Sequence, residues 1–102
     1  MSGEPRACSL PPDEQGDRAA EFRALAGRAL VGRERDEGAV RLSFRADPDV
    51  REAVEDLARR ERECCSFLDF AVEQRNGRVT LAIAAAAAED RATLDAFYEL
   101  AG

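Results

Sequence analysis

The sequence predicts one α+β domain with the element order α-β-β-α-β-β-α. Three observations carry this prediction: a helix signature that begins at Asp47, strict alternation of apolar and polar residues over 40–45, and an Asn76-Gly77 pair typical of a two-residue hairpin. Hairpins join antiparallel strands. We therefore expect a four-stranded antiparallel sheet with the helices packed on one face.

The chain is expected to begin with an irregular segment and a helix. Residues 1–12 contain three prolines, which discourage helix, and the folded domain is assigned to 13–102. Asp13 can cap a helix that runs to Ala26 and stops before Gly27. A chain of 102 residues is suited to a single hydrophobic core.

Two strands should follow, over 28–35 and 40–45, with a turn at 36–38 between them. In the second strand every other residue is apolar, which is typical of a strand with one buried face. These alternating residues are Val40, Leu42 and Phe44.

The central helix is the clearest element. Asp47 caps it and Pro48 occupies its first position, where proline is favoured. Its apolar residues recur at helical spacing and predict a buried stripe. They are Val50, Ala53, Val54, Leu57 and Ala58.

The second half repeats the strand-strand-helix order. We expect strands over 67–73 and 79–84, joined by the Asn-Gly turn, because a type I′ turn needs positive φ at both central residues. Residues 84–88 connect to a last helix that starts at 89 or 90 and ends at Leu100.

Composition excludes several function classes. The formal net charge of -6 disfavours nucleic acid as a binding partner. No apolar run is long enough to span a membrane, so a cytoplasmic protein is expected. The chain has no His and no Lys, which removes Ser-His-Asp and Cys-His catalysis, Schiff-base chemistry and the lysine of a phosphate-binding loop. No nucleotide or organic cofactor is expected.

The three cysteines are the best reactive candidates. Their odd number does not form a complete set of disulfides, so we expect reduced thiols. Thiolates prefer soft metals, and Cys8, Cys64 and Cys65 would suit mercury, arsenite or copper(I). Zinc is a weaker choice because Glu61 or Asp69 would have to complete its four ligands.

Glu61 extends the apolar stripe of the central helix towards the cysteines. A carboxylate there should be buried and should need a cation, for which Arg18 of the first helix is the candidate. Cys64 and Cys65 are adjacent and would point about 100° apart on a helix, so a shared site requires a backbone bend there.

Other interpretations remain open. The protein could be a small cysteine-dependent enzyme or redox protein acting on a thiol-reactive molecule, with Cys64 or Cys65 as the reactive group and Glu61 or Asp69 moving the proton. A position at a helix C-terminus argues against a strongly activated thiolate. The cysteines could also be small buried hydrophobes. A third reading is a noncatalytic interaction domain that forms a homodimer through a sheet face or edge.

The pattern of residues also resembles a known group of proteins. It comprises Cys8-Ser9-Leu10, then Glu14, Arg18, Glu21 and Phe22, and later Arg60-Glu61-x-x-Cys64-Cys65-Ser66-Phe67-x-x-Phe70. This is similar to small uncharacterised bacterial proteins with a C-x-L-P-like segment and an E-x-x-C-C-[S/P]-F motif. The resemblance implies an approximately shared fold and a thiol-centred site, and it names no reaction.

Overall fold

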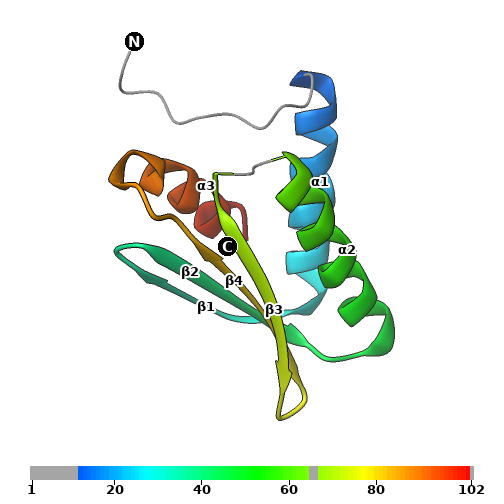
Figure 1. The fold of residues 1–102 in the computed structure, drawn as a ribbon. Helices are drawn as coiled ribbons and strands as arrows, with labels where there is room; N and C mark the ends of the chain where they lie inside the picture. The colour runs from blue at the N-terminus through cyan, green and yellow to red at the C-terminus, as the bar shows by residue number, and fades with distance from the viewer. Residues whose placement is uncertain (1–11, 65–66, 102) are drawn as a thin grey trace.

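The computed structural model describes residues 12–64 and 67–101 and has the predicted order of elements (Figure 1). In chain order they are α1 (Pro12–Ala29), β1 (Leu30–Asp36), β2 (Ala39–Arg45), α2 (Pro48–Cys64), β3 (Asp69–Arg75), β4 (Arg78–Ala84), the 3-10 turn η1 (Ala88–Asp90) and α3 (Arg91–Ala101). No helix within the described ranges is both long and apolar enough to cross a membrane.

The four strands form one antiparallel sheet in the order β1-β2-β4-β3. Each hairpin contributes one central and one edge strand, and the two hairpins meet where β2 pairs with β4. The connections between strands and helices are also tied to the sheet: the Ala85 amide donates to the Gly38 carbonyl at 3.0 Å, and the Ala46 amide donates to the Gly77 carbonyl at 3.2 Å.

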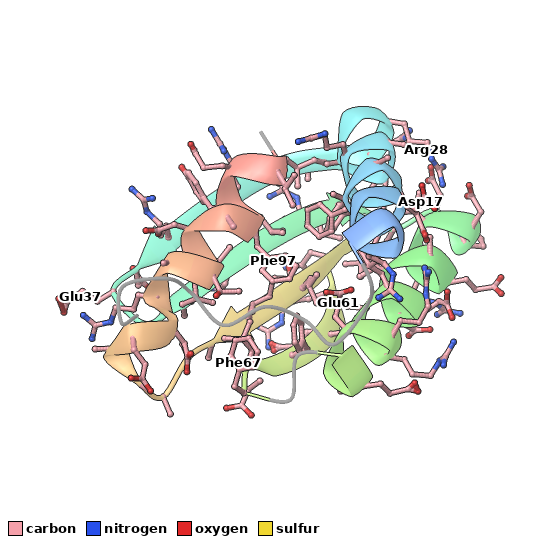
Figure 2. The ribbon with its side chains drawn as sticks, turned by 90° about the horizontal axis from the view of Figure 1, so that it is seen from above. Asp17, Arg28, Glu37, Glu61, Phe67 and Phe97 are labelled. Atoms are coloured by element: carbon pink, nitrogen blue, oxygen red, sulfur yellow. The ribbon has the colours of Figure 1, made fainter. Side chains whose placement is uncertain are left out.

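The hydrophobic core lies between one face of the sheet and the three helices, which Figure 1 shows on the same side. The predicted alternation of β2 is confirmed, and β4 repeats it with Val79, Leu81 and Ile83 buried. Phe97 of α3 sits between Phe22 of α1 and Phe70 of β3, with ring centroids 5.7 Å and 5.9 Å away. Figure 2 shows Phe97 in the interior of this layered structure.

Several element boundaries differ from the sequence predictions by a few residues, and the strand predicted over 28–35 begins at Leu30. The first helix does not stop before Gly27 but continues to Ala29, which is only 2% exposed. Burial of this last turn against the core outweighs the low helix propensity of glycine, which amounts to about 1 kcal/mol. The third strand begins at Asp69 instead of residue 67, although Leu68 is still buried in the core.

The Asn76-Gly77 turn has the backbone conformation that the sequence predicts. The φ angles are 53° and 74°, both in the left-handed region that a type I′ hairpin turn requires. This turn fixes the register of β3 against β4, in which Arg75 lies opposite Arg78.

Alanine substitutions at two glycines should change stability in opposite directions. Gly77→Ala forces a Cβ into a positive-φ conformation and should lower the free energy of unfolding by about 1–2 kcal/mol. Gly27→Ala places a methyl group in open space on a helix and should raise it by up to about 1 kcal/mol. Urea unfolding of both variants measures the two effects, and a stabilised Gly77→Ala would contradict the turn assignment.

Candidate functional site

Helices α1 and α2 lie side by side and run in opposite directions (Figure 1). Among the described side chains, three ion pairs join them, and the residue numbers rise on one helix as they fall on the other. The start of α1 therefore lies beside the end of α2, where the cysteine pair of the sequence begins. The pairs are Arg18–Glu61, Glu21–Arg60 and Arg28–Asp49.

The pair between Arg18 and Glu61 is the most buried of the three. Glu61 is 5% exposed, and Arg18 Nη1 donates a hydrogen bond of 2.5 Å to Glu61 Oε2. Both the burial of Glu61 and its contact with Arg18 confirm the sequence prediction. The opposite charge compensates for the loss of water around the carboxylate, because charges attract more strongly away from solvent.

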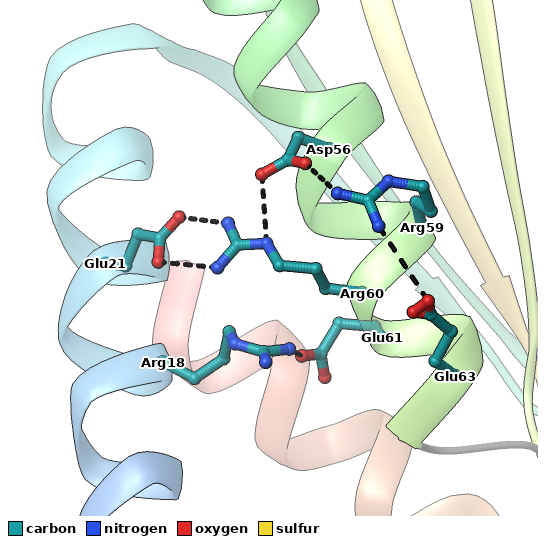
Figure 3. A network of polar contacts seen from close by, with 7 residues as sticks. All are labelled: Arg18, Glu21, Asp56, Arg59, Arg60, Glu61 and Glu63. Carbon is teal, nitrogen blue, oxygen red and sulfur yellow. Dashed lines mark hydrogen bonds and ion pairs between the residues drawn. The ribbon is translucent and has the colours of Figure 1, made fainter.

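A second network extends this contact along the outside of the two helices (Figure 3). Arg60 donates to both carboxylate oxygens of Glu21, and its Nε lies 2.9 Å from Asp56 Oδ2. Arg59 donates to Asp56 and lies 3.8 Å from Glu63. The hydrogen bond from Arg60 lowers the pKa of Glu21, the one from Arg59 lowers the pKa of Asp56, and the Glu21 contact raises the pKa of Arg60.

This second network was not predicted from the sequence. Arg59 interacts only with its own helix among the described residues. Arg60 instead makes a two-point contact with α1. The only available signal was its position next to Glu61, which places it on the flank of the same helix that faces α1.

The last turn of α2 is also attached to the sheet. Arg62 Nε donates a hydrogen bond of 3.1 Å to the Phe70 carbonyl of β3. Phe67 and Leu68, which precede β3, pack against the core. The turn that ends at Cys64 is thus fixed to α1 through Glu61 and to β3 through Arg62.

The structure describes some of the predicted site residues and not others. Cys64 is the last residue of α2, whereas Cys8, Cys65 and the predicted bend lie outside the described residues. Asp69 is exposed and precedes the buried Phe70 of the same strand, so it lies on the sheet face opposite the helices and away from Glu61. Within 12–64 and 67–101, no three His, Cys, Asp or Glu residues form a group that could hold a metal.

Comparison with protein-family models, with curated proteins and with solved structures gives no significant match.

Removing one member of the buried pair should destabilise the protein strongly. Glu61→Ala or Arg18→Ala removes this charge-assisted hydrogen bond from a buried or partly buried charge, and each should lower the free energy of unfolding by roughly 3 kcal/mol. The double variant Arg18→Met, Glu61→Leu should lose less than either single variant, because it removes both charges of the pair and leaves neither one buried.

Chemical denaturation of these variants measures the effect, with Arg28→Ala as the control. That substitution removes an exposed pair and should change stability by about 0–1 kcal/mol. Equal losses in Arg28→Ala and Arg18→Ala would contradict a special role for the buried pair.

The Glu21–Arg60 contact should make stability depend on pH. Arg60 lowers the pKa of Glu21 in the folded chain below its ordinary value of 4.5, so the stabilisation is fully present above that value and disappears as pH falls through the lowered pKa. At pH 7, Glu21→Gln should be less stable than the wild type by about 0.5 kcal/mol, as for other exposed pairs. Thermal unfolding from pH 7 to pH 3 should show this difference shrinking, and a difference that stays constant down to pH 3 would contradict the contact.

Proposed function

We propose that this chain is a thiol protein of the reducing cytoplasm that binds a soft metal or metalloid ion, of the mercury, arsenite or copper(I) class, through Cys8, Cys64 and Cys65. The observation that supports it best is the antiparallel pairing of α1 and α2, held by Arg18–Glu61. It brings the point where the chain enters α1 to the same end of the helix pair as Cys64.

Helix geometry shows that the distances are compatible with this proposal. Pro12 precedes Arg18 by about 9 Å along α1, and Cys64 follows Glu61 by about 4.5 Å along α2, at about 1.5 Å per residue. The two helix ends therefore lie at similar heights. Cys8 is four residues before Pro12, and an extended segment of that length spans at most about 14 Å. Chain length thus allows Cys8 to reach the end of α2.

The chemistry of the thiols favours a metal over an activated nucleophile. The negative end of the α2 dipole disfavours a free thiolate at Cys64, whereas a bound cation or metalloid replaces the thiol protons. With arsenite, As(OH)₃ would form three As–S bonds, and each thiol proton would leave with one hydroxide as water. With mercury(II), each thiol that binds releases its proton to solvent.

The ion pair of Glu61 argues against the enzyme interpretation. A cysteine nucleophile without histidine needs another base, and protonating Glu61 would leave Arg18 unpaired in a partly buried position. Glu61 is better suited to holding the last turn of α2 in place. Asp69 would have to act from the opposite face of the sheet.

Arsenite titration of the reduced protein tests this function. We expect one arsenic per chain, with affinity falling at least about tenfold when Cys8, Cys64 or Cys65 is replaced singly by serine, because each substitution removes a soft ligand. Calorimetry on the wild type, the three variants and the surface control Glu99→Arg measures it. The urea-unfolded chain, which carries the same thiols without their arrangement, should bind more weakly.

Three outcomes would overturn the proposal. They are unchanged affinity in the Cys64→Ser, Cys65→Ser double variant, equal affinity of the folded and unfolded chains, and uptake of more than one arsenic per chain. Unchanged binding in Cys8→Ser alone would remove Cys8 from the site and leave a site of two thiols.

A further inference from the structure

The sheet face opposite the helices carries no helix or strand of the described chain, and many side chains along its two central strands are small. Alternation along each strand assigns residues to this face, because their neighbours are the buried ones. The small residues of its central part are Ala39, Ser43, Thr80, Ala82, Ala84 and Ala71. These small side chains allow another surface to approach the central strands closely.

Charges on this open face are separated along the strands. At one end the register aligns Asp36, Ala39, Ala84 and Asp69 in a row across the four strands. At the other end Arg45, Arg78 and Arg75 form a row across three of them. Between the two rows the face also carries Glu73, as well as Glu34 and Arg41, which lie 3.8 Å apart. Arg41 also lies 3.4 Å from Asp36, so Asp69 is the acid of its row that has no intramolecular partner among the described residues. One end of the face therefore ends in an acidic row and the other in a basic row.

The basic row is a local conflict within the chain. Like charges directly opposite each other on neighbouring strands repel, and here three arginines lie next to one another. Arg45 has an intramolecular partner, since it lies 3.5 Å from Asp47. Within the described ranges, Arg75 and Arg78 of the hairpin and Asp69 at the acidic end form no hydrogen bond or ion pair through their side chains.

We propose that a second copy of this chain packs against the open face, sheet on sheet, around a twofold axis that runs across the strands. This axis reverses the strand direction in the copy, so that the acidic row of each chain lies over the basic row of the other. Asp69 of one chain then faces Arg75 of its copy, on equivalent β3 strands. A twofold axis along the strands would instead place acidic row on acidic row, and charge excludes it.

The size of the face sets the strength of the dimer. Four strands about 4.8 Å apart, each of seven residues rising about 3.3 Å, cover roughly 20 by 23 Å. An interface of that footprint belongs to the small, transient class rather than to obligate dimers. The dimer should therefore be reversible at micromolar concentration, and it should weaken as salt screens the paired rows.

The separation of charge also distinguishes a second copy from other occupants. A polyanion such as nucleic acid would meet the acidic row as well as the basic row, and the chain has a net charge of -6. A copy of the same face complements both rows at once. This matching of a surface to itself is the requirement for a twofold interface.

Charge-reversal variants at Asp69 and Arg75 test the proposal. Sedimentation equilibrium of the reduced protein at about 20 mM salt should show a monomer-dimer equilibrium that shifts to monomer at about 500 mM. Asp69→Arg and Arg75→Glu should each raise the dissociation constant at least about tenfold, because each places like charges opposite one another. The controls Glu99→Arg and Arg91→Glu make the same changes on exposed positions of α3 and should leave it unchanged.

Mixing the two variants provides the decisive measurement. The Asp69→Arg chain presents arginine at both positions and the Arg75→Glu chain presents carboxylates at both, so an equimolar mixture should restore the dimer as a heterodimer. Recovery on mixing also shows that each variant is folded. A monomer at every concentration in low salt, a dimer insensitive to both reversals as edge-to-edge pairing would give, or no recovery on mixing would each overturn the proposal.

Discussion

The alternation of apolar and polar residues in the two central strands is the constraint on which the rest of the structure depends. All six inward residues of β2 and β4 are essentially inaccessible to solvent. A slip of one residue would move each set of three to the other face, so the register of this pair is strongly determined. The same alternation decides which side receives the helices and leaves the small side chains of Thr80 and Ala82 on the other.

The two halves of α1 are held by different forces. Phe22, Leu25 and the residues that follow attach the C-terminal half to the core through apolar contact. The half from Pro12 to Glu21 has no large apolar side chain, and Arg18 and Glu21 join it to α2 through ion pairs. The end of the helix pair beside Cys64 therefore depends on electrostatics, whereas the other end depends mainly on burial. Local opening should begin at the electrostatic end, because ion pairs contribute less than packing when they are partly solvated.

Local patterns allowed much of this structure to be predicted, and long-range geometry accounts for what was missed. The Asn76-Gly77 turn follows from two adjacent residue types, and the burial of Glu61 follows from spacing along one helix. Both could therefore be predicted from the sequence. The strand order depends on whether the second hairpin pairs with β1 or with β2, and in the structure β4 pairs with β2. The contact of Arg60 with α1 depends on how the two helices cross. The helix passes through Gly27 because a tertiary contact outweighs a local propensity. Neither the pairing of helices nor the charge separation of the open face is visible until the register is known.

Glu61 and Asp69 stand on either side of the cysteine pair in the sequence and have opposite environments in the fold. Helical periodicity turns Glu61 into the core layer, where it must be neutralised, and Arg18 meets that need. Strand periodicity turns Asp69 to the open face, where it is exposed to water and has no ion-pair partner among residues 12–64 and 67–101. A buried carboxylate such as Glu61 therefore depends on its ion pair, because removing Arg18 would leave a desolvated charge with less compensation. An exposed carboxylate such as Asp69 is solvated and needs no cation of its own chain, so it can form an ion pair with another molecule.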